Sequence, residues 1–154
     1  MRYFIELSYN GKAYHGWQNQ PNAISVQEVL ENALSTLLGE SVAIVGAGRT
    51  DAGVHAKQIF AHFDTEQIIE KAQLVYKLNS FLPKDIAIHN VFKVKPDAHA
   101  RFDALNRSYL YRISLKKNAF NTEQAYFVKQ QLDVEKMKEA AKILLDYKDF
   151  QCFS

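Results

Sequence analysis

The pattern of apolar and polar positions predicts four strands in the first two thirds of the chain. Residues 2–9 and 57–64 alternate with a period of two, which is typical of strands with one buried face. Residues 41–46 form a short run suited to a buried strand, and residues 85–94 are predicted as a fourth strand. Segments with helical spacing separate the first strand from the second, and the third from the fourth.

The clearest helix is predicted over residues 26–38. Its apolar side chains recur at i, i+3, i+4 and i+7. Ser25 and Glu28 form a capping box at its start, and Gly39 stands where a helix ends. A second helix is predicted over about 66–80. The apolar side chains expected on its inner side are Ile68, Ala72, Val75 and Tyr76.

The order of these elements predicts an α+β chain. Strand, helix, strand, strand, helix, strand is the ferredoxin-like (RRM-like) β-α-β-β-α-β arrangement. A further strand at 107–115 and a helix at 133–145, capped by Asp133, indicate the start of a second α+β half. We therefore expect one domain over 1–100 and the beginning of another over 101–154. The side chains expected to face inward from the last helix are Val134, Met137, Ala141, Leu144 and Leu145.

Composition narrows the class of protein. The chain has 154 residues, 47% hydrophobic and 23% charged, which is enough for a packed core and unlike a disordered chain. The single cysteine, Cys152, excludes an internal disulfide and is interpreted as a lone buried thiol. No apolar stretch resembles a signal peptide or a membrane span, so we expect a cytoplasmic protein that binds no membrane.

Positive charge gathers in the second half of the chain. Residues 1–77 carry a net charge of −2, and residues 78–154 a net charge of +4. The densest basic stretch, residues 93–117, also contains Phe102 and Tyr109. Cations interleaved with aromatic rings suit phosphate contacts and base stacking. The alternative is an ordinary solvated face of strand and loop.

The segment from Gly46 to Ala56 has the strongest chemical character. Three glycines within eight residues flank Arg49 and Asp51, and glycine permits close approach of a ligand to the backbone. If the chain is extended, positions i and i+2 point the same way, and the arginine favours an ionised carboxylate. Asp51 could then act as nucleophile, base or electrostatic stabiliser. The alternative is a hairpin turn whose aspartate caps backbone amides.

Other common site patterns do not fit. Val54 follows Gly53 where a phosphate-binding loop needs lysine, and the spacing for a dinucleotide fingerprint also fails. The five histidines have no metal-ligand spacing, and we predict no metal site. Trp17 lies in a predicted loop, where it could pack as a lid or stack on a base.

The stretch from Gly48 to Ala56, GRTDAGVHA, resembles the signature of the TruA family of tRNA pseudouridine synthases. Further blocks resemble that family along the whole chain. They are Tyr9-Asn10-Gly11, Gly16-Trp17-Gln18, Ser25-Val26-Gln27, His99-Ala100-Arg101-Phe102, Arg107-Ser108-Tyr109-Leu110-Tyr111 and Asp149-Phe150-Gln151-Cys152-Phe153. Members of the family are longer, so the chain resembles their N-terminal portion.

The resemblance implies a function and a set of residues. It implies conversion of uridine to pseudouridine in the anticodon stem-loop of tRNA, by a homodimer that needs no cofactor. Asp51 matches the catalytic aspartate, Arg49 the arginine beside it and Tyr109 the tyrosine that stacks on the target base. The residues expected to contact the RNA are Arg101, Arg107, Trp17 and Gln18. A non-catalytic RNA-binding module, or a portion inactive without its C-terminal half, remain alternatives.

Overall fold

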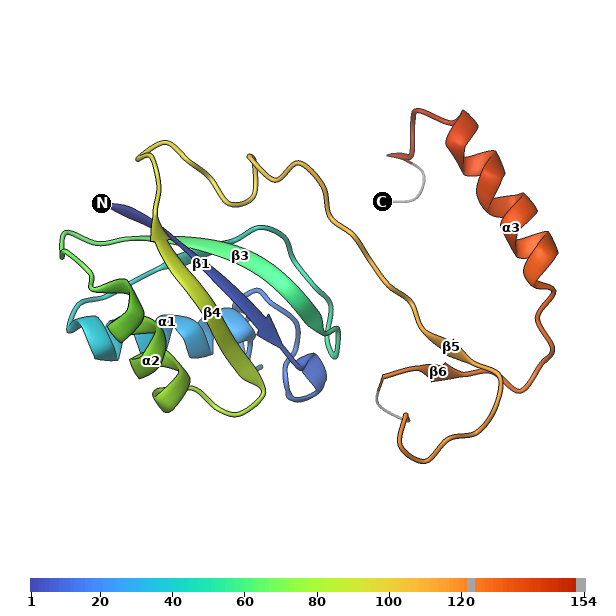
Figure 1. The fold of residues 1–154 in the computed structure, drawn as a ribbon, viewed down its shortest axis with the longest axis horizontal. Coiled ribbons are helices and arrows are strands. Elements are labelled where there is room, and N and C mark those ends of the chain that lie inside the picture. The colour runs from blue at the N-terminus through green and yellow to red at the C-terminus, as the bar shows by residue number, and fades with distance from the viewer. Residues whose placement is uncertain (122–123, 152–154) are drawn as a thin grey trace. The chain divides into compact units, whose positions relative to one another are not determined.

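The computed structural model describes residues 1–121 and 124–151 (Figure 1). The chain divides into two compact units, Met1–Arg107 and Ser108–Ser154. Cys152, predicted as a buried thiol, lies outside the described residues. Among the described residues, no helix combines the length and the apolar character that a membrane span requires.

The first unit contains the predicted ferredoxin-like arrangement, which confirms the α+β class. A four-stranded sheet has the order β2-β3-β1-β4, and every neighbouring pair is antiparallel. The prediction of helix 26–38 is confirmed to the residue, whereas β2 is shorter than the predicted 41–46. The elements are β1 (Arg2–Tyr9), η1 (Gly11–Ala13), α1 (Val26–Leu38), β2 (Ile44–Gly46), β3 (Ala56–Asp64), α2 (Lys71–Phe81) and β4 (Ile86–Lys93).

The core of this unit lies between the sheet and the two helices (Figure 1). Burial alternates along β1, so every second side chain enters the core. The cap predicted for α1 is present, since the Ser25 side chain accepts from the Glu28 N–H at 3.1 Å. Gly39 ends that helix in the left-handed conformation. The core side chains from these elements include Tyr3, Ile5, Leu7, Leu30, Leu34, Phe63, Leu78 and Val91.

The inner face predicted for the second helix is right at Val75, which packs against the core, and wrong at its other three positions. Ile68 precedes the helix and is 91% exposed, while Tyr76 is 75% exposed. The helix begins at Lys71, because the Glu70 side chain accepts from the first free N–H groups. Its buried side chains are Leu74 and Leu78, four residues apart. Tyr76 is two positions from each leucine and therefore faces outward at 100° per residue.

The second unit has little regular structure of its own. It contains β5 (Ile113–Ser114) paired in parallel with β6 (Tyr126–Phe127), then α3 (Val134–Ile143) and η2 (Leu144–Asp146). Asp133 caps α3 as predicted. The predicted strand at 107–115 is wrong apart from two residues, because no described strand pairs with residues 108–111.

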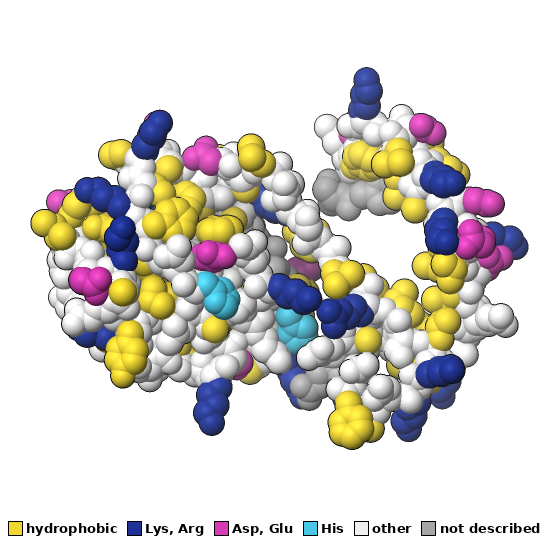
Figure 2. Space-filling view, viewed as in Figure 1, with side chains coloured by type: hydrophobic (Ala, Val, Ile, Leu, Met, Phe, Trp, Pro, Cys, Tyr) yellow, Lys and Arg dark blue, Asp and Glu magenta, His cyan; other side chains and the backbone are white. Residues whose placement is uncertain are grey.

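The side chains expected to face inward from the predicted helix 133–145, which the structure divides into α3 and η2, are also exposed. None of that helix is buried, and the surface of this unit carries uncovered hydrophobic side chains (Figure 2). Leu145 is 84% exposed and Val134 is 50% exposed. Helical spacing identifies an apolar stripe, but burial needs a second element against it, and the described part of this unit provides none.

Candidate active site

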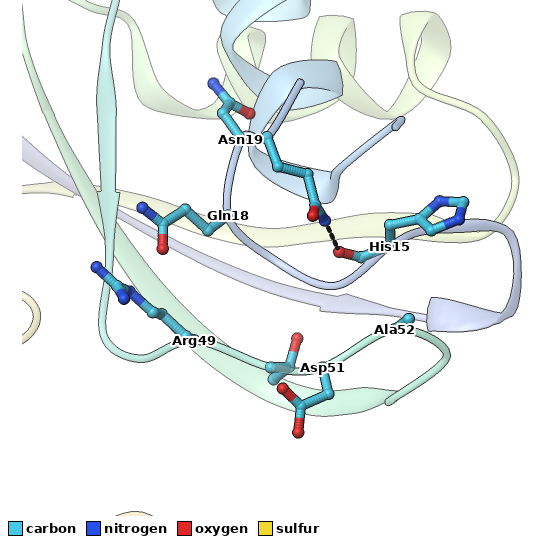
Figure 3. Close-up of a pocket in the computed structure, with 8 residues that line it drawn as sticks. His15, Gln18, Asn19, Arg49, Asp51 and Ala52 are labelled. Atoms are coloured by element: carbon cyan, nitrogen blue, oxygen red, sulfur yellow. Dashed lines mark hydrogen bonds between the residues drawn. The ribbon is translucent and has the colours of Figure 1, made fainter. Parts of the chain in front are cut away.

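Two loops of the first unit meet beside the sheet. One joins β2 to β3 (residues 47–55) and the other joins β1 to α1 (residues 10–25). Between them lies a depression of about 330 Å³ (Figure 3). It is lined by His15, Gln18, Asn19, Gln20, Arg49, Thr50, Asp51 and Ala52.

Two glycines allow the loops to touch backbone to backbone. A Cβ on Gly16 would lie 2.1 Å from the Thr50 carbonyl oxygen, and one on Gly11 would lie 2.0 Å from that of Val54. Gly16 also has φ of +83°, in the region that only glycine adopts readily. The Gly11 N–H donates to Nδ1 of His55 at 3.0 Å. Any side chain at these two glycines would push the 47–55 loop away.

Hydrogen bonds then fix the loop that carries Asp51. The Trp17 N–H donates to the Thr50 carbonyl at 3.2 Å, and the Gly53 N–H donates to the Tyr14 carbonyl at 3.1 Å. The hydroxyls of Tyr9 and Thr50 are 2.8 Å apart and share a hydrogen bond. The loop backbone is therefore held on both sides of Asp51, although it forms no helix or strand.

The buried side chain of Trp17 packs beside this loop. Its side chain is only 3% exposed and packs against Tyr9, with ring centroids 6.1 Å apart. A Cβ on Gly46 would lie 2.4 Å from the indole ring, so the ring lies directly against the backbone at the end of β2. A ring buried to this degree has no free face for a base. Of the two roles considered from the sequence, packing is the one the structure contains.

Two side chains on α1 attach the 10–25 loop and the first residue of β2 to the helix. Glu31 accepts from the Ile44 N–H at 2.9 Å and from the Asn19 side chain at 2.7 Å. Gln27 donates to the Ile44 carbonyl at 3.1 Å and accepts from the Asn19 N–H at 3.2 Å. Sequence reasoning missed this pair. The available signal was a polar pair, spaced i and i+4, on a helix whose other face is apolar.

Asp51 and Arg49 do not form the predicted pair. Figure 3 shows their side chains extending in different directions. Neither side chain has a hydrogen bond or an ion pair within the described ranges, and both residues are exposed. Alternation at i and i+2 holds only in a strand, and residues 47–55 belong to none. The Asp51 carbonyl, not its carboxylate, accepts from the Val54 N–H at 3.2 Å, so the carboxylate does not act as a turn cap.

The remaining predicted site residues lie in different surroundings. Gln18 is exposed on the depression, and Arg101 is exposed with its guanidinium 5.9 Å from the Phe102 ring centre. The Arg107 guanidinium donates to backbone carbonyls beside the loop. Tyr109 belongs to the second unit, where its side chain is 76% exposed.

Two titratable side chains near the site have shifted pKa values. Burial, together with a hydrogen bond to Asp85 at 2.7 Å, raises the pKa of the Tyr14 hydroxyl well above its usual range. Burial lowers the pKa of His62, and the charge of Arg2 and neighbouring His99 lower it further. Tyr14 and His62 are therefore neutral at pH 7.

Within residues 1–121 and 124–151, no three histidine, cysteine or acidic side chains converge as they would on a metal ion. The polar side chains of the depression that have no partner in the described chain are His15, Gln18, Arg49 and Asp51. Gln18 contributes an amide, Arg49 a cation and Asp51 a carboxylate. This combination suits a polar ligand that carries both negative charge and hydrogen-bonding edges.

Comparison with known proteins gives consistent matches. A family model described as tRNA pseudouridine synthase matches residues 7–103, which include the whole 47–55 loop. A protein of Bacteroides thetaiotaomicron named tRNA pseudouridine synthase A is 54% identical over 153 residues. The match covers 99% of this chain and 57% of that protein.

Two more relatives carry the same name. The one from Azobacteroides pseudotrichonymphae is 53% identical over 152 residues, covering 99% of this chain and 61% of the relative. The one from Thermoanaerobacter sp. is 42% identical over 151 residues, covering 97% and 62% respectively. The chain thus spans about three fifths of the length of the curated relatives it matches.

Proposed function

The chain belongs to the tRNA pseudouridine synthase family, and we propose that its protein isomerises uridine to pseudouridine in tRNA, with Asp51 as the catalytic carboxylate. One observation supports this most. Asp51 is an exposed carboxylate without a partner in the described chain, on a loop whose backbone is attached on both sides. A reactive group needs this combination of a fixed backbone and an unused side chain.

The chemistry asks for a carboxylate beside the ribose. In the isomerisation the N1–C1′ bond breaks, the base turns and a C5–C1′ bond forms, while C5 loses a proton and N1 gains one. Atoms and electrons balance within the nucleotide, so the reaction needs no redox cofactor. An ionised carboxylate can attack the sugar or remove a proton from it, and either step loosens the bond to the base.

The base must leave the helical stack before Asp51 can reach its ribose. Extrusion costs a few kcal/mol, and stacking on an aromatic ring returns roughly 1–3 kcal/mol. We assign that ring to Tyr109 and a contact with the extruded nucleotide to Arg49, both by resemblance to the family. Exposed Arg101 and Gln18 are further proposed RNA contacts.

The finer parts of the proposal follow the same resemblance. They are the anticodon stem-loop as the place of reaction, a homodimer as the working unit and the cytoplasm as the compartment. The basic stretch 93–117 supports an RNA partner, since lysines and arginines there can contact phosphates. The relatives' names support tRNA, and nothing finer.

Release of tritium tests the proposal directly. Unmodified tRNA transcripts carrying tritium at C5 of uridine lose the label to water when pseudouridine forms. The 154-residue chain and a protein of the full length of its relatives are assayed side by side. We expect release by the longer protein, and none by its Asp51→Asn variant, which keeps the side chain's size but removes its charge.

Asp97→Asn is the matched control. Asp97 is also exposed but lies outside the depression, so this variant should release tritium normally. Normal release of tritium by the Asp51→Asn variant would show that the Asp51 carboxylate is not needed for the reaction. Binding of tRNA without release by any form would favour a non-catalytic RNA-binding module.

A further inference from the structure

Arg107, expected from the sequence to contact RNA, has its guanidinium turned to the protein. Its Nε and Nη2 atoms donate to the Ala47 carbonyl oxygen at 2.9 and 2.6 Å, and Nη2 also donates to the Arg101 carbonyl at 2.7 Å. One planar group thus joins two backbone segments, 60 and 6 residues away in sequence. Hydrogen bonds from a charged donor are shorter and stronger than those between neutral groups.

The carbonyl that Arg107 holds marks the start of the Asp51 loop. The Ala47 N–H on the other side donates to the Phe60 carbonyl of β3 at 2.7 Å, so β3 and Arg107 fix this residue between them. The guanidinium also lies over Gly48, where a Cβ would be 3.3 Å from its Nε atom. The absence of a side chain at Gly48 therefore provides the space that the Arg107 side chain occupies.

The other carbonyl belongs to a well-anchored turn at residues 98–103. The buried Nδ1 of His62 accepts from the Ala100 N–H at 3.1 Å, which ties the turn to β3. The Asp103 carboxylate accepts from the His99 N–H at 2.7 Å. Nδ1 of His99 accepts from the Arg101 N–H at 3.2 Å. Arg107 therefore connects the loop to a turn that is itself hydrogen-bonded to β3.

We propose that Arg107 is a positioning residue, which holds the start of the 47–55 loop against the 98–103 turn and so sets the place of Asp51. This inference rests on the proposed function for its catalytic consequence. Its structural part stands on the contacts alone. A lysine cannot substitute, because its single ammonium lacks the planar fork that reaches both carbonyls.

The rival role is a phosphate contact, and two substitutions separate the two roles. Arg107→Ala removes both the fork and the charge, whereas Arg107→Lys keeps the charge alone. A phosphate contact is largely rescued by lysine, which binds phosphate as a point charge. Hydrogen bonds from one guanidinium to two carbonyls are not rescued by lysine. Arg101→Ala is the comparison variant, since it removes an equal charge from an exposed side chain six residues away.

The first measurement is hydrogen exchange of the peptide spanning 46–56 in the 154-residue chain. Arg107→Ala and Arg107→Lys should both exchange roughly tenfold faster there, because the loop opens locally more often. Arg101→Ala should exchange as the unchanged chain does. Circular dichroism and thermal melting show whether each variant is folded. Unchanged loop exchange in a folded Arg107→Ala variant would overturn the proposal.

The second measurement compares tRNA affinity and single-turnover rate in a protein of the full length of the relatives. Both Arg107 variants should lower the rate roughly 10–100-fold, as expected for displacement of a reacting group by about 1 Å. The slope of log affinity against log salt should not change. A slope reduced by about 0.7–0.9 in Arg107→Ala, restored in Arg107→Lys, would identify a phosphate contact and overturn the proposal.

Failure of the proposed function gives a different result. If no form releases tritium from labelled tRNA, the catalytic assignment fails. Faster hydrogen exchange of the loop in the Arg107 variants would still support Arg107 as the residue that holds the loop in place. If tritium is released at an unreduced rate by both Arg107 variants, positioning by Arg107 is wrong and the enzyme assignment stands.

Discussion

Replacing Gly16 by alanine gives the sharpest test of how the two loops set the place of Asp51. Gly16 has φ of +83°, and its added Cβ would lie 2.1 Å from the Thr50 carbonyl oxygen and 3.2 Å from the carbonyl carbon of Asp51. Real Cβ atoms essentially never come within 3.0 Å of such an atom. Both neighbours are backbone, so no side chain can swing aside, and the 47–55 loop must retreat by about 1 Å.

The structure allows the size of the effect to be worked out. A side chain in the left-handed region costs roughly 1–2 kcal/mol. Overpacking against a fixed neighbour costs typically about 1–3 kcal/mol more. Gly16→Ala should therefore lower the free energy of unfolding by about 2–5 kcal/mol. Displacement of a catalytic group by about 1 Å should also lower turnover roughly 100-fold.

Gly39→Ala is the matched control. Gly39 has φ of +68°, but an added Cβ there meets nothing within 4 Å. This variant carries the conformational cost alone, about 1–2 kcal/mol. Urea unfolding of both variants measures the difference, and hydrogen exchange of the peptide 46–56 shows whether the loop moved. Equal stability losses with unchanged loop exchange would refute the argument from close contact.

Two further predictions concern the same region. Tyr9→Phe removes the hydroxyl that is 2.8 Å from the Thr50 hydroxyl and should lower the free energy of unfolding by roughly 1 kcal/mol. In urea unfolding, Tyr9→Phe and Thr50→Val should together cost less than the sum of the single variants, and full additivity would contradict the contact. Because burial lowers the pKa of His62 below its ordinary 6.5, the unfolded chain binds more protons just below that pH. The free energy of unfolding should therefore fall as the pH drops through 6.5 toward the lower pKa of folded His62. The urea midpoint should show this pH dependence, and the dependence should be absent in His62→Phe.

Local signals predicted the first half of the fold well. Helix α1 matched to the residue, because its cap, apolar stripe and terminal glycine all lie within its own sequence. Helix α2 has a weaker pattern. Its inner face is set by Leu74 and Leu78, while the neighbouring Ile68 and Tyr76 are apolar yet exposed. Choosing between these two sets requires knowledge of where the sheet lies, which the helix sequence does not contain.

The site shows the same division between local and distant information. The loop was found because Gly48, Arg49 and Asp51 lie together in the sequence. The orientation of their side chains was not predicted, because residues 47–55 form no helix or strand whose period fixes where each side chain points. The supports from Glu31 and Arg107 also escaped prediction. The Arg107 contact, for instance, spans 60 residues, and no spacing rule reaches that far.

The placement of Asp51 is consequently a property of several weak attachments rather than of one strong element. The loop cannot satisfy its backbone groups through a ladder, so β3, Arg107 and the 10–25 loop must supply partners one by one. Loss of any one attachment opens the loop locally while the core of β1 and α1 stays packed. Arg107→Ala, which removes one attachment without adding a clash, should therefore lose turnover out of proportion to global stability, whereas Leu30→Ala in the core should do the opposite. A scaffold of this kind lets the proposed catalytic carboxylate of Asp51 remain exposed and unpaired without the loop losing its order.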